Sequence, residues 1–139
     1  MDGTVRSPSE RCELLRSLHV PGTPLVLPNA WDAASARAVV AAGFPVVATT
    51  SGGVATALGY EDGQAAPPAE MMAAAARIVA AVDVPVTVDA EAGYGMAPGE
   101  LVDTLLRVGA AGCNLEDTDH TTALLMEAAH QAEWLAGVR

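Results

Sequence analysis

The chain has 139 residues, of which 51% are hydrophobic and 4% aromatic, so we expect one ordinary domain with a core of Ala, Val and Leu. The net charge is −10 and all seven basic residues are arginine, which argues against nucleic acid as a partner. No apolar run approaches the roughly 20 residues of a membrane helix, and residues 1–9 lack secretory-signal features, so we expect a cytoplasmic protein without a membrane segment.

The chain opens with a predicted lead-in helix over residues 7–19. Ser7-Pro8-Ser9-Glu10 has the form of a capping box with proline at the first helical position, which is typical of a helix start. A first strand-helix unit follows, with a short aliphatic strand at 25–27 and an alanine-rich helix at 31–42 that ends before Gly43.

Three more strand-helix units are predicted after Gly43. The expected strands lie at 44–50, 84–89 and 112–116, and the expected helices lie at 68–81, from Pro98 onward and at 126–138. Residues 51–67 are predicted to form a long Gly-rich connection. In the helix that opens at Pro98, the inward face is expected to be Leu101, Val102, Leu105 and Leu106.

The alternation of strand and helix predicts a single α/β domain over residues 1–139. Right-handed β-α-β units laid side by side form a parallel sheet, and four units suit either a small open doubly wound sheet or the first half of an eight-stranded barrel. No Gly-x-Gly-x-x-Gly follows the first strand, which disfavours a nucleotide-binding fold. The pattern alone leaves both architectures open.

Acidic residues stand where the strands are expected to end. They are Asp62, Asp89, Glu91, Glu116 and Asp117. Acidic side chains at one edge of a sheet repel one another unless a cation lies among them, and the chain has no lysine. A hard divalent cation prefers oxygen ligands, so the sequence predicts a Mg²⁺ site at this edge.

Five short motifs in a fixed order carry a resemblance to a known family. They are PNAWDAASAR (28–37), TTSGG (49–53), LGYED (58–62), DAEAGYG (89–95) and NLED (114–117). Together they resemble the isocitrate lyase and phosphoenolpyruvate mutase superfamily over about residues 25–139. The resemblance implies a TIM-barrel type fold of parallel (βα) units, with about four of the eight units present, the N-terminal half barrel.

The resemblance also implies a function. We expect a Mg²⁺-dependent lyase or mutase that acts on a small α-oxo or 2-hydroxy carboxylic acid, with Mn²⁺ as the alternative metal. Such an enzyme forms or breaks a C–C or P–C bond through a metal-stabilised enolate. The second hypothesis is a truncated, catalytically inactive fragment or a small-molecule-binding module of the same fold, because the second half of the site is missing from this chain.

The same resemblance assigns roles to individual residues. Ser51, Gly52 and Gly53 match a turn that binds a substrate carboxylate through hydroxyl and backbone N–H groups. Asp62 matches an aspartate on a mobile segment that closes over the metal and the substrate.

The metal ligands are also implied by the resemblance. Asp89 matches the direct metal ligand, whereas Glu91 and Glu116 match acids that hold metal-bound waters. Relatives commonly have aspartate at position 91, so Glu91 is one methylene longer.

One loop departs from the family pattern. The lyases of the family place a Lys-x-Cys-Gly-His loop after the fourth strand, whereas residues 118–123 contain neither lysine nor cysteine. This departure argues against an isocitrate or methylisocitrate lyase. His120 is the histidine of this loop, and histidine is the side-chain type most often used for proton transfer, so it is the candidate proton shuttle.

A half barrel leaves its first and fourth strands as open edges. Their sequences are typical of buried strands, which favours pairing between chains and predicts a homo-oligomer, such as a dimer that closes two halves. The other expected partner is the small carboxylic acid substrate, with neither nucleic acid nor membrane.

Overall fold

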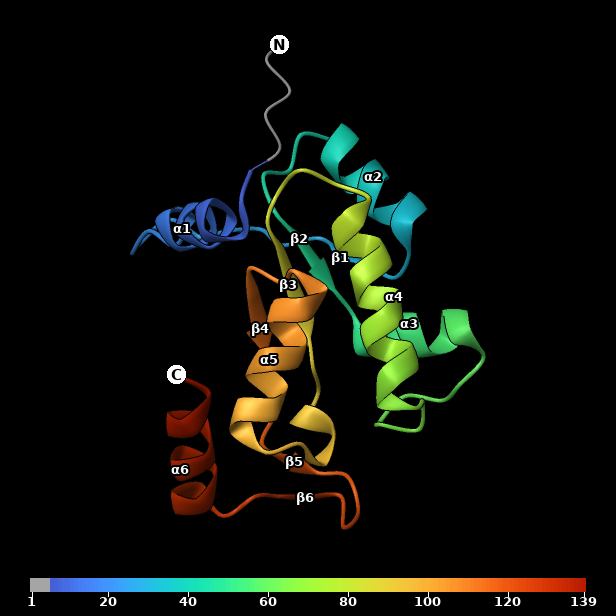
Figure 1. Cartoon of the computed structure of the whole chain (residues 1–139), viewed down its shortest axis with the longest axis vertical. Coiled ribbons are helices and arrows are strands. Elements are labelled where there is room, and N and C mark those ends of the chain that lie inside the picture. The colour runs from blue at the N-terminus through green and yellow to red at the C-terminus, as the bar shows by residue number, and fades with distance from the viewer. Residues whose placement is uncertain (1–5) are drawn as a thin grey trace.

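The computed structural model of this protein describes residues 6–139, so the first five residues of the N-terminal stretch predicted to lack a signal lie outside it. Its centre is a sheet of four parallel strands in the order β1-β2-β3-β4, with bounds Asn29–Ala30, Val47–Thr49, Val86–Asp89 and Gly112–Asn114. The connecting helices are α2 (Ala33–Ala41), α3 (Ser51–Leu58), α4 (Pro68–Ala80) and α5 (Pro98–Val108), and α6 (Ala128–Val138) ends the chain (Figure 1). The predicted series of parallel strand-helix units is confirmed.

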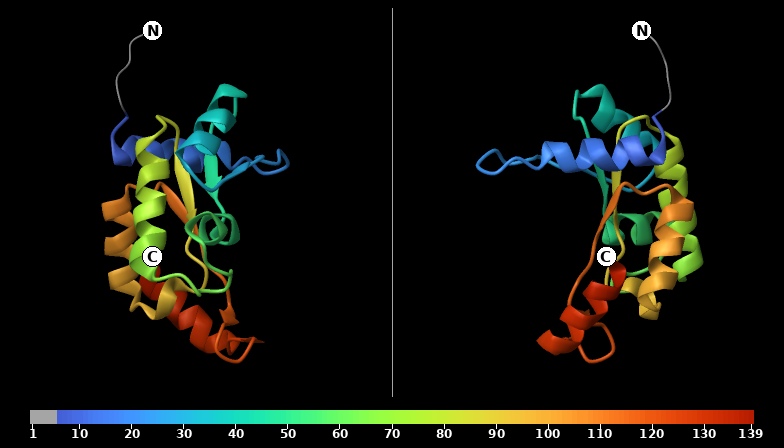
Figure 2. Two further views of the ribbon diagram at one scale, coloured as in Figure 1. Left: turned by 90° about the vertical axis from the view of Figure 1, so that its right-hand side faces the viewer. Right: turned by 60° about the vertical axis from the view of Figure 1, so that its left-hand side comes forward.

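Helix α1 (Pro8–Leu18) is the predicted lead-in helix, and its capping box is present. The Glu10 N–H donates to Ser7 Oγ at 3.3 Å, and the Ser7 N–H donates to Glu10 Oε2 at 2.7 Å. Figures 1 and 2 show α1 near the end of the sheet where the strands begin. There Leu15 lies so close to Gly112 that a Cβ on Gly112 would stand 2.9 Å from Leu15 Cδ2. The helix therefore covers the beginning of β4.

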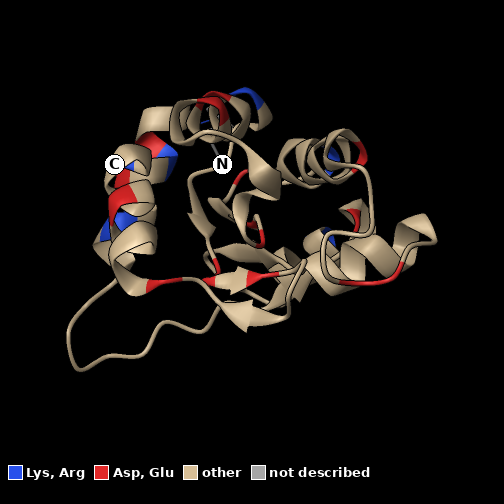
Figure 3. Ribbon diagram, turned by 90° about the horizontal axis from the view of Figure 1, so that it is seen from below, with Lys and Arg blue, Asp and Glu red and all other residues tan. Residues whose placement is uncertain are grey.

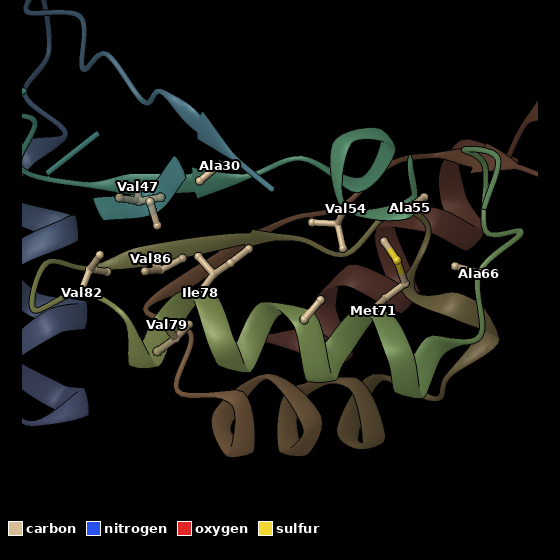
Figure 4. Close-up of a cluster of buried hydrophobic side chains, with 12 residues drawn as sticks. Ala30, Val47, Val54, Ala55, Ala66, Met71, Ile78, Val79, Val82 and Val86 are labelled. Carbon is tan, nitrogen blue, oxygen red and sulfur yellow. The ribbon is translucent and has the colours of Figure 1, made fainter. Parts of the chain in front are cut away.

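The hydrophobic core lies between the sheet and helices α4 and α5. Ile78 of α4 is fully buried together with Val47 of β2 and Val86 of β3 (Figure 4). A second cluster contains Val88 of β3 and Leu101 of α5. Because these contacts fix the strands against the helices, they also fix the positions of the strand ends that carry the acidic residues.

The predicted inward face of α5 is wrong at one residue. Leu101 and Leu105 are buried and Val102 is half-buried, but Leu106 is 63% exposed. A helix turns by about 100° per residue, so Leu106 lies one step beyond the stripe of Leu101 and Leu105 and faces solvent.

The predicted strand at 25–27 is also wrong. Pairing with β2 begins at Pro28, whose carbonyl accepts a hydrogen bond from the Ala48 N–H at 3.1 Å, and continues into β1. Val26 is 62% exposed. The aliphatic run therefore precedes the sheet, because a short apolar run alone does not specify a strand.

Helix α3 corrects the prediction of an irregular connection over 51–67. The Thr50 side chain caps this helix by accepting a hydrogen bond from the Gly53 N–H at 3.4 Å, and Gly59 ends it with φ +90°. Glycines lower helix propensity, which is why the sequence indicated a loop. The cap and the burial of Val54 against the core outweigh this cost.

Two small elements stand near the end of the sheet where the strands finish. The short 3-10 helix η1 (Gly93–Gly95) lies between β3 and α5, and an antiparallel hairpin of β5 (Thr118–Asp119) and β6 (Leu124–Leu125) precedes α6 (Figures 1 and 2). The predicted loop at 118–123 is therefore part of a hairpin.

Charge is distributed unevenly around this end of the molecule. Figure 3 shows several acidic segments near the centre of the view, whereas arginine segments lie on the surrounding helices. Within residues 6–139, no helix combines the length and the apolar composition needed to cross a bilayer.

Candidate metal and substrate site

The acidic residues predicted as metal ligands stand at the ends of neighbouring strands. Asp89 is the last residue of β3, Glu91 follows it by two positions, and Glu116 follows β4. The Glu91 N–H donates to Asp89 Oδ1 at 3.2 Å, and the Glu116 N–H donates to the Glu91 carbonyl at 2.8 Å. The parallel pairing of β3 and β4 thus brings the main chains of the three residues to one edge of the sheet.

Glu91 is enclosed by the protein, with only 2% of its surface exposed. Its Oε2 accepts a hydrogen bond from the Gln64 N–H at 2.6 Å, and its Oε1 accepts one from the Tyr94 hydroxyl at 3.1 Å. Burial raises the pKa of Glu91, and the negative charge of Asp62 adds to the rise, although the two hydrogen bonds oppose it. Burial and the neighbouring Glu91 charge also raise the pKa of Tyr94.

Asp89 forms hydrogen bonds with the start of α3 and with β2. Its Oδ2 accepts a hydrogen bond from the Ser51 N–H at 2.9 Å, and its own N–H donates to Thr49 Oγ1 at 2.9 Å. A cavity of about 10 Å³ is lined by these three residues and Tyr94, among others. This volume suits at most a single water molecule, so a substrate would have to approach Asp89 from another side.

The predicted carboxylate-binding residues Ser51, Gly52 and Gly53 form the first turn of α3, which corrects their placement in an irregular loop. A Cβ on Gly52 would stand 2.8 Å from Asp62 Oδ2, and a Cβ on Gly53 would stand 2.6 Å from Thr50 Cγ2. Glycine therefore permits both close approaches. The structure places the Asp62 carboxylate directly beside the start of α3.

The ring of His120, in the β5–β6 hairpin, reaches the acidic residues. Its Nε2 lies 3.3 Å from Glu116 Oε2, which is the one ion pair within residues 6–139 when the ring is protonated. The orientation is not that of a hydrogen bond, and in the described part of the chain this buried nitrogen has no hydrogen-bond partner. A positive charge on His120 would lower the pKa of Glu91.

A cleft of about 530 Å³ adjoins His120. It lies between the segment 92–98, the hairpin and α6, and its lining includes Gln64, Met96 and Trp134. Asp89 and Glu91 do not line it. The cleft therefore lies beside the predicted metal residues, none of which lines it.

The donor chemistry fits a hard divalent cation. Asp89 and Glu116 offer partly exposed carboxylates, and no arginine forms a salt bridge with an acid in the described range 6–139. Within the same range, however, no three His, Cys, Asp or Glu side chains stand close enough together to hold a metal ion. The set of Asp89, Glu91 and Glu116 as metal residues stays a prediction.

Two residues at the site have no role in the sequence-based predictions. Gln64 and Tyr94 supply the two hydrogen bonds to the Glu91 carboxylate. The only local signal for Tyr94 is its position between two glycines three residues after an acid. Gln64 carries no such signal, because it contributes its main-chain N–H.

Comparison with known proteins identifies the family of this chain. The family model of phosphoenolpyruvate phosphomutase matches residues 15–139. A protein of Burkholderia cenocepacia, provisionally named a phosphonomutase, has a solved structure with 47% sequence identity and a TM-score of 0.88, covering 94% of this chain and 54% of that one. An uncharacterised protein of Mycobacterium tuberculosis is 43% identical over 101 residues, which is 73% of this chain and 39% of the relative. The structure of an oxaloacetate acetylhydrolase in complex with its product oxalate has 26% identity and a TM-score of 0.82, covering 96% of this chain and 49% of that one.

The fold and these similarities define an α/β protein of the TIM-barrel type with about half of the barrel present, as predicted. The chain belongs to the phosphoenolpyruvate phosphomutase family, in the superfamily of phosphoenolpyruvate mutase and isocitrate lyase. This superfamily includes mutases and lyases, the similar structures also include the oxaloacetate acetylhydrolase, and superfamily members typically depend on a divalent metal ion. The chain spans 39% of the length of the mycobacterial relative and about half of the similar solved structures.

Proposed function

We propose that this protein acts as a Mg²⁺-dependent lyase or mutase on a small α-oxo or 2-hydroxy carboxylic acid and forms or breaks a C–C or P–C bond. The observation that carries the proposal is the set of acidic residues at adjoining strand ends without an arginine partner in the described range. Family membership supports it, as does the likeness to an oxaloacetate acetylhydrolase that holds oxalate.

Asp89 is the proposed direct metal ligand, with Glu91 and Glu116 acting through water. A bound divalent cation would draw charge from the carbonyl of a chelated 2-oxo acid and so stabilise an enolate. The Asp89 carboxylate accepts hydrogen bonds from the Ser51 and Glu91 N–H groups, which would hold it in place for this role.

The remaining residues are proposed to bind the acid and to move a proton. The Ser51 hydroxyl and the N–H groups of Gly52 and Gly53 would donate to a substrate carboxylate at the start of α3, and Asp62 would cover it. His120 would transfer the proton, because its buried Nε2 has no hydrogen bond to break first in the described structure.

Mg²⁺ is expected to promote binding of oxalate to the full chain, since a planar dicarboxylate mimics an enolate of a 2-oxo acid. We expect Asp89→Ala to weaken Mg²⁺ affinity by at least about tenfold, because even residues behind the direct ligands typically have effects of this size. Isothermal titration calorimetry with Mg²⁺ and then oxalate measures both, and oxaloacetate turnover follows the reaction.

The matched control is Asp103→Ala, which removes an exposed aspartate from α5. This variant is expected to bind Mg²⁺ and oxalate like the parent. Equal loss in both variants, or no Mg²⁺-dependent oxalate binding by the parent, would contradict the proposed function. Metal and oxalate binding without turnover of any oxo acid would favour the alternative of a catalytically inactive binding module.

We also propose that a second copy of this chain covers the open edges of the sheet. In the described structure β1 and β4 each pair on one side only, and the similar solved structures are about twice as long as this chain. Two copies would supply the eight strands that a closed barrel needs. Unpaired strand edges favour such association.

Size-exclusion chromatography with light scattering is expected to give the mass of two chains. Replacing Cys113 of β4 by proline removes a backbone donor at the edge strand and is expected to shift the mass toward one chain. A parent chain that has the mass of one chain at every concentration tested would rule out the second copy.

A further inference from the structure

Three non-glycine residues at the site have a left-handed backbone conformation, with positive φ. Gln64, Glu91 and Tyr94 have φ values of +62°, +48° and +54°, a region that residues with a side chain rarely adopt. The three residues come from two separate loops, one after α3 and one after β3. Strained backbone of this kind persists only where surrounding contacts hold it.

The Glu91 carboxylate is the group that joins them. One oxygen accepts the Gln64 N–H at 2.6 Å and the other accepts the Tyr94 hydroxyl at 3.1 Å. The main chain of Glu91 is itself anchored, because its N–H donates to Asp89 and its carbonyl accepts from the Glu116 N–H. The segment after β3 is thus anchored at the ends of β3 and β4, and the buried Glu91 side chain reaches from it to the loop after α3.

That loop has few other hydrogen bonds, although Ala66 near its end is buried in the core cluster. Among residues 6–139, the bond from the Gln64 N–H to Glu91 is the hydrogen bond that ties residues 61–66 to the rest of the chain. The same segment carries Asp62, whose carboxylate lies against Gly52 at the start of α3. The position of Asp62 therefore depends on how this segment is held.

We propose that Glu91 is a positioning residue that latches residues 61–66 over the start of α3 and so keeps Asp62 beside Gly52. The reach of the side chain is essential, because an aspartate at position 91 is one methylene shorter and leaves the Gln64 N–H without its acceptor. The latch itself is a structural proposal. Only its consequence for acid binding, through Asp62, rests on the proposed function.

Two substitutions at position 91 separate the effect of side-chain length from the effect of negative charge. Glu91→Asp keeps the carboxylate but shortens it, whereas Glu91→Gln keeps the length and an oxygen that accepts from Gln64 while its amide donates to the Tyr94 oxygen. Hydrogen-deuterium exchange of the full chain, read at the Gln64 amide, is expected to accelerate about tenfold or more in Glu91→Asp. In Glu91→Gln the protection is expected to be largely retained.

Peptides from α4 and β3 report global stability in the same experiment, and Glu100→Asp at an exposed position of α5 is the matched control. The α4 and β3 peptides of Glu91→Asp are expected to exchange as they do in the parent, and so is the Gln64 amide of Glu100→Asp. The latch is overturned if Glu91→Asp leaves the Gln64 amide unchanged, if Glu91→Gln accelerates it equally, or if the core peptides accelerate by the same factor.

Oxalate titration with Mg²⁺ then connects the latch to the site. Glu91→Asp is expected to bind oxalate several-fold more weakly than Glu100→Asp. A parent chain that binds no oxalate would refute the proposed function, while the exchange data would still decide whether the latch exists. Unchanged oxalate affinity in Glu91→Asp, with faster exchange at Gln64, would overturn the link to Asp62.

Discussion

Gly52→Ala is expected to lower kcat/KM for the proposed turnover of an oxo acid by about 100-fold, the size of effect that a displacement of about 1 Å at a reacting centre produces. The new Cβ would stand 2.8 Å from Asp62 Oδ2 and 3.1 Å from its Cγ, so the carboxylate must move away from the start of α3. The free energy of unfolding is expected to stay within about 1 kcal/mol of the parent, because alanine favours helix and an aspartate side chain can rotate. Steady-state kinetics and urea denaturation measure the two effects.

Gly99→Ala is the matched control for this prediction. Gly99 also lies in the first turn of a helix, α5, and a Cβ there meets no atom within 4 Å. Its kcat/KM is expected to equal that of the parent. If Gly52→Ala retained full activity, the close approach of Asp62 to α3 would have no part in the reaction.

Leu101→Ala is expected to lower the free energy of unfolding by about 2–5 kcal/mol, the range observed when a buried leucine is truncated. Leu101 has no exposed surface and packs in the cluster between β3 and α5, near Gly93. Because total domain stability is about 5–15 kcal/mol, the variant should lose a large part of it. Chemical denaturation followed by circular dichroism gives the difference.

Leu106→Ala provides the comparison on the same helix. Leu106 is 63% exposed, so its truncation should change the free energy of unfolding by no more than about 0.5 kcal/mol. Similar losses in both variants would mean that the outer face of α5 is covered in solution, which is contrary to the burial seen in the monomer.

Most of the elements could be predicted from local sequence. The capping box at Ser7 and the proline at the start of α5 mark helix starts through their own side chains and backbone. The first strand and α3 could not be predicted in this way. Pairing through the Pro28 carbonyl decides where β1 begins, and the burial of Val54 against the core, together with the Thr50 cap, stabilises α3 despite its glycines.

The sequence predicted which acidic residues belong to the candidate site, but it predicted their spatial arrangement only in part. Motif order indicated Asp89, Glu91 and Glu116 at the strand ends, and the parallel sheet brings their main chains to one edge. The hydrogen-bond partners of Glu91 were not predictable. Gln64 acts through its main chain, which leaves no mark on side-chain patterns, and the bond spans 27 positions of sequence.

The sequence by itself determined the repeated alternation of strand and helix, the family and the acidic character of the strand ends, because caps, hydrophobic periodicity and motifs are local properties. Only the tertiary structure decided which donors meet each acid and how deeply each carboxylate is buried. Those features depend on loops packed against one another across long separations, where backbone reach and exclusion of water set the outcome.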